Sequence, residues 1–425
     1  MKEPFETRAA RTRAYVLHPD LGRRRDPAPR LEEALALARA LPDLDVVGGE
    51  IVPLRDPRPG TLFGSGRLAE IGASLRAADV ELVLVDGPVT PVQQRNLEKE
   101  WKVKLLDRTG LILEIFSDRA ATREGVLQVE MAALAYQRTR LVRAWTHLER
   151  QRGGLGFVGG PGETQIEADR RAIDDQIARL KGQLQKVVRT RQLHRDARAK
   201  VPYPVVALVG YTNAGKSTLF NRLTGADVLA KDMLFATLDP TMRAVRLEGV
   251  GDVILSDTVG FVSDLPTQLV AAFRATLEEV LSADLILHVR DIAAAETVEQ
   301  AADVEAILGE LGTPSDMPRL EVWNKIDRLP GDARDVMDVQ AARRDDVIPI
   351  SATTGEGIDG LLAAMAEILG GARSVDRIVL GPERGRQRAW LHQAGLVTRE
   401  ATRDDGAAEI DVEWTETQKA AFERL

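Results

Sequence analysis

The chain has 425 residues, 44% of them hydrophobic, a formal net charge of −8 and no cysteine. This length corresponds to about three domains of ordinary size, and the lack of cysteine excludes disulfides and thiolate chemistry. No apolar run approaches the ~18 residues of a membrane span, and the N-terminus lacks a signal-peptide core, so we expect a cytoplasmic protein without membrane contact.

Charge is distributed unevenly along the chain. Residues 119–200 hold 17 Lys/Arg against 9 Asp/Glu, a local net charge of +8, which leaves −16 for the remainder. A basic segment in an acidic protein indicates a surface that faces a polyanion. A solvated helix face with many ion pairs would give the same pattern, so charge alone leaves both interpretations open.

The first 118 residues alternate between strand and helix signals. This alternation predicts an N-terminal parallel α/β domain over residues 1–118. Within it, Gly64-Ser65-Gly66-Arg67 stands where a helix begins and could bind an anion, but a plain turn is favoured. Strands are expected at 14–17, 46–52, 82–85 and 103–106, and helices at 31–38, 67–75 and 92–101.

Residues 119–200 predict a basic helical hairpin. Apolar residues recur every three to four positions over 126–150 and 163–195, which is typical of two long helices that pair. Residues 152–164 separate them, and six glycines between 153 and 162 predict a flexible tip. The arms carry Arg138, Arg140, Arg143, Arg170, Arg171, Lys181, Lys186, Arg189 and Arg191.

A phosphate-binding motif opens the third region, residues 201–371. Gly210-Tyr211-Thr212-Asn213-Ala214-Gly215-Lys216-Ser217 matches G-x-x-x-x-G-K-[ST] in full, between an apolar run at 205–209 and a helical segment from Thr218. Backbone N–H groups of such a loop surround phosphates at a helix N-terminus. We expect Lys216 to reach the terminal phosphates as a catalytic residue and Ser217 to bind Mg²⁺. The alternative is a glycine turn between two core elements.

Three further motifs follow expected strands at 253–255, 320–323 and 347–350. In Asp257-Thr258-Val259-Gly260, the carboxylate can hold the Mg²⁺ shell and the catalytic Gly260 N–H can contact the terminal phosphate. In Asn324-Lys325-Ile326-Asp327, Asp327 can accept both guanine N1–H and the exocyclic amine, a donor pair that adenine lacks. Asn324 is expected to brace the phosphate loop and Lys325 to cover the base. Ser351-Ala352-Thr353 would offer a backbone N–H to guanine O6, so GTP and GDP are the predicted nucleotides.

The segment Phe235-Ala236-Thr237-Leu238-Asp239-Pro240-Thr241 lies between Ser217 and Asp257. We predict a mobile loop that contacts the nucleotide and completes the Mg²⁺ coordination through Thr237, a third catalytic residue. Thr241 is the alternative ligand.

Two residues bear on the rate of hydrolysis. Phe261 stands where many switch GTPases carry a water-orienting glutamine, which predicts slow intrinsic hydrolysis unless a partner, an ion or another residue of the chain substitutes. Asn213 occupies a position where related GTPases use asparagine to help bind a monovalent cation, so K⁺ stimulation is a further hypothesis.

Further distinctive motifs occur at residues 63–67 (FGSGR), 91–97 (PVQQRNL), 152–156 (RGGLG), 160–165 (GPGETQ) and 169–171 (DRR), in addition to GYTNAGKST and FATLDPT. Through these motifs, nearly the whole chain resembles the HflX family of ribosome-associated GTPases. The glycine-rich tip is the most family-specific of these. Arg67 and Met242 depart from the common lysine and threonine, and neither departure affects the assignment.

The resemblance implies a multidomain α/β architecture. It comprises an N-terminal parallel α/β domain, a helical hairpin, a Ras-like P-loop GTPase domain and a small C-terminal α+β domain over residues 372–425, for which no role is assigned. It also implies binding to the large ribosomal subunit near the peptidyl-transferase centre. The rRNA would be contacted through the N-terminal domain and the hairpin.

Family members are described as splitting stalled or hibernating ribosomes when GTP is bound, with hydrolysis as the release timer. Some are reported to bind ATP through the N-terminal domain. We expect a monomer, although no pattern fixes the oligomeric state. The alternative function is a GTPase switch that acts on a non-ribosomal protein or membrane effector. A small-molecule kinase is disfavoured by guanine selection and the lack of a recognisable acceptor site.

Overall fold

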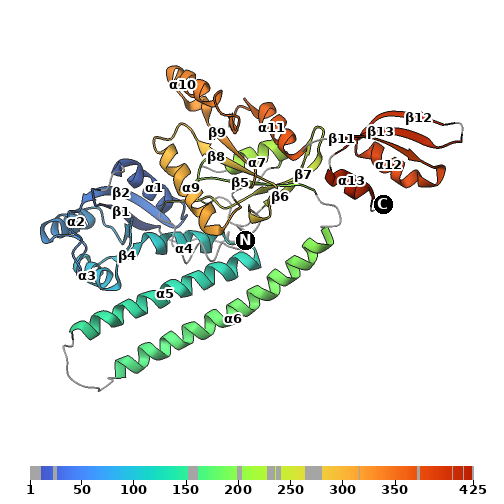
Figure 1. Cartoon of the computed structure of the whole chain (residues 1–425). Helices are drawn as coiled ribbons and strands as arrows, with labels where there is room; N and C mark the ends of the chain where they lie inside the picture. Colours follow the sequence, from blue (N-terminus) through green and yellow to red (C-terminus); the bar gives the residue numbers. More distant parts are fainter. Residues whose placement is uncertain are drawn as a thin grey trace, which may run out of the picture.

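The computed structural model describes residues 11–22, 26–151, 161–198, 203–226, 235, 241–263, 280–314, 316–370, 374–403, 405–414 and 416–423. This part of the chain consists of three separate sheets with their accompanying helices and one long helical hairpin (Figure 1). The predicted class, a multidomain α/β protein around a P-loop GTPase domain, is confirmed. No helix in the described ranges is both long and apolar enough to span a bilayer.

The N-terminal sheet has the strand order β2-β1-β3-β4, and every neighbouring pair is parallel. The expected alternation of strands and helices is therefore confirmed. Of the predicted turn Gly64–Arg67, only Gly64 precedes α2, and Arg67, in the first turn of that helix, pairs with Glu50 and Glu70. The elements are β1 (Thr12–Asp20), α1 (Pro27–Arg39), β2 (Leu44–Pro53), α2 (Ser65–Ala77), β3 (Leu82–Val85), α3 (Pro91–Trp101), β4 (Lys104–Asp107) and α4 (Arg108–Arg119).

Helix α4 was not expected from the sequence. Seven of its residues are buried, among them Leu111, Ile112, Leu113, Ile115 and Phe116. Its exposed polar residues, Glu114, Ser117 and Asp118, form only one narrow face, so most of the helix surface is apolar. Its position explains the pattern, because α4 packs against the N-terminal sheet on one side and against the GTPase domain on the other.

The hairpin consists of α5 (Arg123–Gln151) and α6 (Pro161–Arg198), which run side by side (Figure 1). Leu127 and Leu134 of α5 are buried against Leu180 of α6, so the predicted pairing of two long helices is confirmed. Helix α6 begins slightly before the expected position, at Pro161, a residue well suited to the first turn of a helix. Residues 152–160 of the predicted glycine-rich tip lie outside the described residues.

The GTPase domain contains a six-stranded sheet in the order β10-β9-β8-β5-β7-β6. All neighbouring pairs are parallel except β6 with β7. Strand β6 was not predicted, because it is largely half-buried or exposed and lacks an apolar run. The strands are β5 (Val205–Val209), β6 (Thr241–Leu247), β7 (Gly251–Asp257), β8 (Leu285–Asp291), β9 (Arg319–Asn324) and β10 (Val347–Pro349). The helices are α7 (Lys216–Thr224), α9 (Thr297–Leu311), η1 (Ile326–Arg328), α10 (Gly331–Ala341) and α11 (Ile358–Gly370).

A small antiparallel sheet in the order β11-β13-β12 forms the C-terminal unit, at the end of the GTPase domain away from the N-terminal sheet (Figure 1). Strand β13 alternates strictly between buried and half-buried residues and packs Trp414 against Phe422. The elements are β11 (Ser374–Leu380), η2 (Pro382–Arg384), α12 (Gly385–Gln393), β12 (Val397–Thr402), β13 (Ala408–Trp414) and α13 (Glu416–Glu423).

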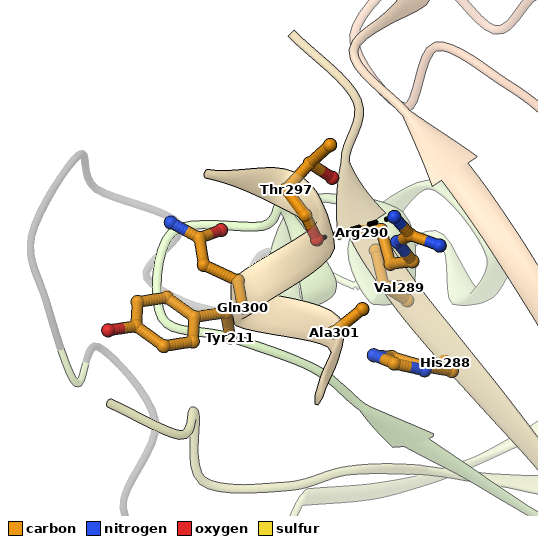
Figure 2. Close-up of a pocket in the computed structure, with 7 residues that line it drawn as sticks. All are labelled: Tyr211, His288, Val289, Arg290, Thr297, Gln300 and Ala301. Carbon is orange, nitrogen blue, oxygen red and sulfur yellow. Dashed lines mark hydrogen bonds between the residues drawn. The ribbon is translucent and has the colours of Figure 1, made fainter. Parts of the chain in front are cut away.

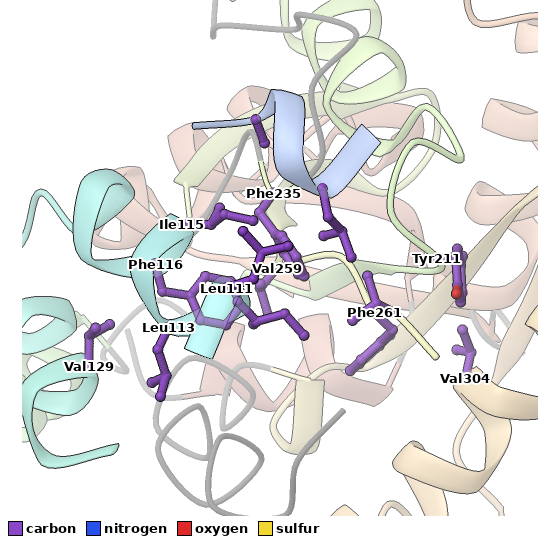
Figure 3. Close-up of a cluster of buried hydrophobic side chains, with 14 of the residues drawn as sticks. Leu111, Leu113, Ile115, Phe116, Val129, Tyr211, Phe235, Val259, Phe261 and Val304 are labelled. Carbon is purple, nitrogen blue, oxygen red and sulfur yellow. The ribbon is translucent and has the colours of Figure 1, made fainter. Parts of the chain in front are cut away.

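The N-terminal and GTPase domains share one hydrophobic core (Figure 3). Leu111 and Phe116 of α4 belong to the same cluster as Phe235, Val259 and Phe261 of the GTPase domain. The rings of Phe116 and Phe235 meet edge to face with centroids 4.6 Å apart. The loop predicted to contact the nucleotide, through Phe235, and the segment that follows the predicted phosphate contact Gly260, through Phe261, therefore both contact the N-terminal domain.

Candidate functional site

The phosphate loop connects β5 to α7 in the geometry that its glycines require. A Cβ on Gly210 would lie 2.2 Å from the carbonyl oxygen of Val289, and one on Gly215 would lie 2.2 Å from Nδ2 of Asn324. Both residues also have a positive φ, of 152° and 95°. Glycine is therefore required at both positions for two reasons: the positive φ, and the close approach of β8 to Gly210 and of β9 to Gly215.

Lys216 begins α7 and is only 6% exposed. Its Nζ donates to the carbonyl oxygens of Gly210, at 3.0 Å, and Tyr211, at 2.8 Å. Burial lowers the pKa of Lys216 to about 8, against the opposing effect of Asp257. A phosphate bound here would favour the charged ammonium, so the side chain is already positioned for an anion.

Oxygen ligands suited to Mg²⁺ meet beside the loop. Ser217 Oγ donates to Asp257 Oδ2 at 2.7 Å, and Asp257 is fully buried at the end of β7. The next residue, Thr258, is anchored by its Oγ1, which donates to the Leu208 carbonyl at 2.6 Å. Hydroxyl and carboxylate oxygens are the donors that Mg²⁺ prefers, so this pair fits the ion. Thr237 lies outside the described residues, and Thr241 pairs with Asp257 at the start of β6.

One side chain joins the motifs expected to recognise the base. Asn324 Nδ2 donates to the Ala214 carbonyl at 2.8 Å, and its Oδ1 accepts the Ala352 N–H at 2.9 Å. The predicted brace of the phosphate loop is thus present. Lys325 Nζ lies 2.7 Å from Asp291 Oδ2, and Asp327 is exposed in η1. Behind them Ile326 and Ser351 are buried.

Phe261 faces the protein core. It is 1% exposed, and its ring points into the cluster shared with α4 (Figure 3). Its backbone is tied to the phosphate loop, because its N–H donates to the Gly210 carbonyl and its carbonyl accepts the Thr212 N–H. The segment after Asp257 therefore lies directly on the loop.

A narrow gap lies between the loop, β8 and α9 (Figure 2). Across it, Arg290 Nη2 donates to the Thr297 carbonyl at 3.3 Å. The gap is too tight to hold a water molecule and offers no room for a nucleotide. The seven residues that line it are Tyr211, His288, Val289, Arg290, Thr297, Gln300 and Ala301.

Sequence reasoning missed a buried network between the domains. Arg108, 5% exposed, donates to Asp86 at 2.5 Å, Glu33 at 2.6 Å and the carbonyl oxygen of Ser263 at 3.0 Å. Burial opposes the ionisation of Asp86, but Arg108 and His18 hold its pKa below the ordinary value. Burial and the charge of Glu33 raise the pKa of Tyr211, whose hydroxyl bonds that carboxylate. The partners come from distant parts of the chain and match no motif. The one feature of the sequence that could have indicated the network is Arg108, an arginine just after a predicted strand.

The basic residues of the hairpin have different surroundings. Arg140 donates to Asp107, Gln94 and the Tyr136 hydroxyl, and so ties α5 to the N-terminal domain. Arg138 pairs with Asp174 across the two helices at 2.7 Å. Other members of the set lie on the exposed surface of α6, namely Arg170, Arg171, Lys181, Lys186 and Arg189. Among the members whose side chains the structure describes, these exposed residues fit the prediction of a polyanion-facing surface, whereas Arg138 and Arg140 pair with carboxylates of the same chain; the side chains of Arg143 and Arg191 lie outside the described part.

Family models match consecutive parts of the chain. "GTP-binding GTPase N-terminal" matches residues 28–117 and "GTP-binding GTPase Middle Region" matches residues 119–198. "50S ribosome-binding GTPase" matches residues 205–325, and "HflX C-terminal domain" matches residues 336–425. Together these matches cover nearly the whole chain.

Individual proteins are similar over the same length. A GTPase HflX of Magnetococcus marinus is 49% identical over 396 residues, which cover 92% of this chain and 90% of that protein. A GTPase HflX of Escherichia coli is 43% identical over 380 residues, 89% of this chain and 88% of that one. A solved GTP-binding protein of Sulfolobus solfataricus in complex with GDP has 24% identity and a TM-score of 0.45, over 84% of this chain and 98% of that chain.

Proposed function

Because this chain belongs to the HflX family of GTPases, we propose that it binds the large ribosomal subunit and splits stalled or hibernating ribosomes in its GTP-bound state. The family and the GTPase activity predicted from the motifs are confirmed by the matching models and relatives. Ribosome splitting, the cytoplasmic location and a monomeric state are part of the proposal. The main support for ribosome binding is the exposed basic surface of α6. The nucleotide motifs, which lie together at one edge of the GTPase sheet, support its dependence on GTP.

We assign the nucleotide to the carboxyl edge of the GTPase sheet. Lys216 and the Gly260 N–H bind the terminal phosphate, and Asp327 selects guanine. Ser217 and Thr237 would hold Mg²⁺, with Asp257 beside it, and a bound ion would supply positive charge next to the phosphates. Phe261 supplies no group to orient water, so intrinsic hydrolysis is slow. K⁺ near Asn213, an exposed residue of the loop with a φ of 60°, is proposed to raise the rate.

The contacts of the two nucleotide-responsive segments support a mechanical role. Phe235 packs on Phe116 of α4, and Phe261 lies in the same core. Because α4 belongs to the N-terminal domain, a change in either segment alters how that domain is held. GTP binding thereby fixes the orientation of the N-terminal domain and the attached hairpin for ribosome binding. Hydrolysis removes this constraint and releases the ribosome.

Cosedimentation with purified large subunits tests the proposal. Protein loaded with a non-hydrolysable GTP analogue is expected to pellet with the subunits at moderate salt. Replacement of Arg170 and Arg171 by alanine should lower the slope of log affinity against log salt by about 1.4–1.8, the loss of two phosphate contacts. GTP affinity should not change, because both residues lie on α6, away from the phosphate loop.

Arg343 and Arg386 provide a matched control, since both are exposed arginines outside the hairpin, one in the turn after α10 and the other on α12. Their double replacement by alanine makes the same charge change and should leave the salt slope intact. Protein that stays off the large subunits with the analogue bound would refute the ribosomal function and favour a switch with another effector. A splitting role further requires that the analogue-bound protein dissociate intact ribosomes in light scattering.

A further inference from the structure

The carboxyl edge of the N-terminal sheet is occupied by another part of the same chain. The strand order β2-β1-β3-β4 reverses between β1 and β3, and the crevice outside such a reversal is where open α/β sheets bind their ligands. His18 of β1 and Asp86, directly after β3, stand at this place with 2.7 Å between His18 Nδ1 and Asp86 Oδ2. Arg108 reaches the same point from the start of α4.

Ser263 of the GTPase domain fills the position of the ligand. Its carbonyl oxygen accepts from Arg108 Nη2 at 3.0 Å, and its hydroxyl oxygen accepts from Arg30 at 2.9 Å. The hydroxyl also donates to Glu33 at 3.1 Å. Ser263 is buried and follows Phe261 by two residues. The N-terminal domain thus holds the segment that extends from the terminal-phosphate motif.

Tyr211 links this contact to the phosphate loop. Its hydroxyl oxygen accepts the Ser263 N–H at 2.7 Å and donates to Glu33 Oε2 at 3.0 Å. One side chain of the loop therefore bonds both the switch segment and the N-terminal domain. We refer to Glu33, Arg108, Tyr211 and Ser263 as the interdomain clasp.

Gly260 lies close to the loop, beside Phe261, whose backbone bonds Gly210 and Thr212, and in the same segment as Ser263 of the clasp. A Cβ on Gly260 would lie 3.0 Å from Lys216 Nζ and 2.8 Å from Thr212 Cγ2, so there is no room for even a methyl group between Gly260 and these residues. A terminal phosphate that binds the Lys216 ammonium and the Gly260 N–H has to enter between them. The segment must therefore move outward when a triphosphate binds, whereas a diphosphate makes no such demand.

We propose that the interdomain clasp determines the discrimination between GTP and GDP, with Glu33 and Arg108 acting as specificity-determining residues from outside the GTPase domain. The clasp opposes the outward movement and so weakens triphosphate binding relative to diphosphate binding. By linkage, the terminal phosphate releases Ser263 from the N-terminal domain to the same extent. This inference rests on the proposed assignment of the nucleotide to the phosphate loop.

Equilibrium binding of GDP and of a non-hydrolysable GTP analogue, with Mg²⁺ and the full chain, tests the clasp. Tyr211→Phe removes the hydroxyl that bonds Ser263 and Glu33, and Glu33→Gln removes the charge that Arg108 neutralises. Each change should raise the ratio of analogue affinity to GDP affinity about fivefold or more, the lower end of measured couplings between sites.

Tyr136→Phe is the matched control. Its hydroxyl also donates to a buried carboxylate, Asp107, at 2.6 Å, but Tyr136 lies on α5 of the hairpin and outside the clasp. This variant should leave the affinity ratio within about twofold of the original. Equal changes in both affinities for Tyr211→Phe and Glu33→Gln would overturn the proposal. Lys216→Ala should abolish binding of both nucleotides, and retained binding would instead refute the nucleotide site itself.

Hydrogen exchange of the unmodified protein gives a second measurement that needs no variant. The Ser263 amide donates to Tyr211 in the clasped state. It should exchange faster with the GTP analogue bound than with GDP bound, because the outward movement breaks this bond. Equal protection in the two complexes contradicts release of the clasp.

Discussion

The two parallel sheets of this chain present their carboxyl edges to different occupants. At the edge of the GTPase sheet, β5, β7, β9 and β10 end in loops that carry the nucleotide motifs. At the edge of the N-terminal sheet, β1, β3 and β4 end in charged side chains that bond one another and the neighbouring domain. The same architecture therefore supports a ligand site in one domain and a protein contact in the other.

The two edges differ in the surroundings of their buried cationic side chains, Lys216 in the GTPase domain and Arg108 in the N-terminal domain. Lys216 donates to two backbone carbonyls, and the burial that lowers its pKa to about 8 favours the arrival of an anion. Arg108 is neutralised by two carboxylates, Asp86 and Glu33, which hold its pKa above the ordinary value despite burial. A cation that is already neutralised has little further affinity for phosphate and binds a backbone carbonyl instead.

The largest expected effect in this comparison comes from Arg108. Arg108→Met retains much of the side-chain volume but leaves Asp86 and Glu33 buried without their cation. Removal of one partner of a buried pair typically costs about 3–5 kcal/mol. We expect a loss of this size in the free energy of unfolding, measured by urea denaturation monitored by circular dichroism.

Arg140→Met is the control for this variant. Arg140 bonds Asp107 at the same sheet edge, but this buried carboxylate also accepts from the Gly110 N–H at 2.9 Å and the Tyr136 hydroxyl at 2.6 Å, so it keeps two hydrogen bonds when the arginine is lost. The loss should therefore be smaller, about 1–2 kcal/mol. If the two variants were equally stable, the pairing of Arg108 with two carboxylates would not be the feature that distinguishes its network.

The edge of the GTPase sheet could be predicted from the sequence, because its motifs are local. Each one is a short run directly after an apolar strand, and the chain direction places all the carboxyl ends of parallel strands together. The contact of Asn324 with Ala214, expected from this reasoning, is present. The roles of these residues toward the nucleotide remain predictions.

The edge of the N-terminal sheet could not be predicted in the same way. Glu33 and Tyr211 are 178 positions apart, and Arg108 and Ser263 are 155 apart, so no spacing rule connects them. Helix α4 was missed for a related reason, since its burial by two domains leaves only a narrow polar face, with Glu114, Ser117 and Asp118. Strand β6 carries too few buried residues to be recognised without its partner β7.

Asp327→Asn tests whether the GTPase edge selects its base as proposed. Asparagine offers one acceptor oxygen where the carboxylate offers two, and its NH₂ group faces the guanine donors. We expect GTP affinity to fall by about 10- to 100-fold, in line with ~1–3 kcal/mol for an unmade hydrogen bond. Xanthosine triphosphate, which has an acceptor at this position, should gain affinity in the same equilibrium assay. An unchanged preference for guanine would remove Asp327 from the site.

The smallest expected effect concerns the exposed side of the phosphate loop, where Asn213 has a φ of 60°. If the Asn213 oxygen helps bind K⁺, the ion adds positive charge beside the phosphates. Hydrolysis should then be about three- to tenfold faster in K⁺ than in Na⁺, equivalent to ~0.7–1.4 kcal/mol. Asn213→Gly is the sharpest variant, because glycine adopts a positive φ without strain and only the side chain is lost. It should equalise the two rates while the rate in Na⁺ stays the same. Equal rates in the unmodified protein would instead show that the loop binds phosphate without a monovalent ion.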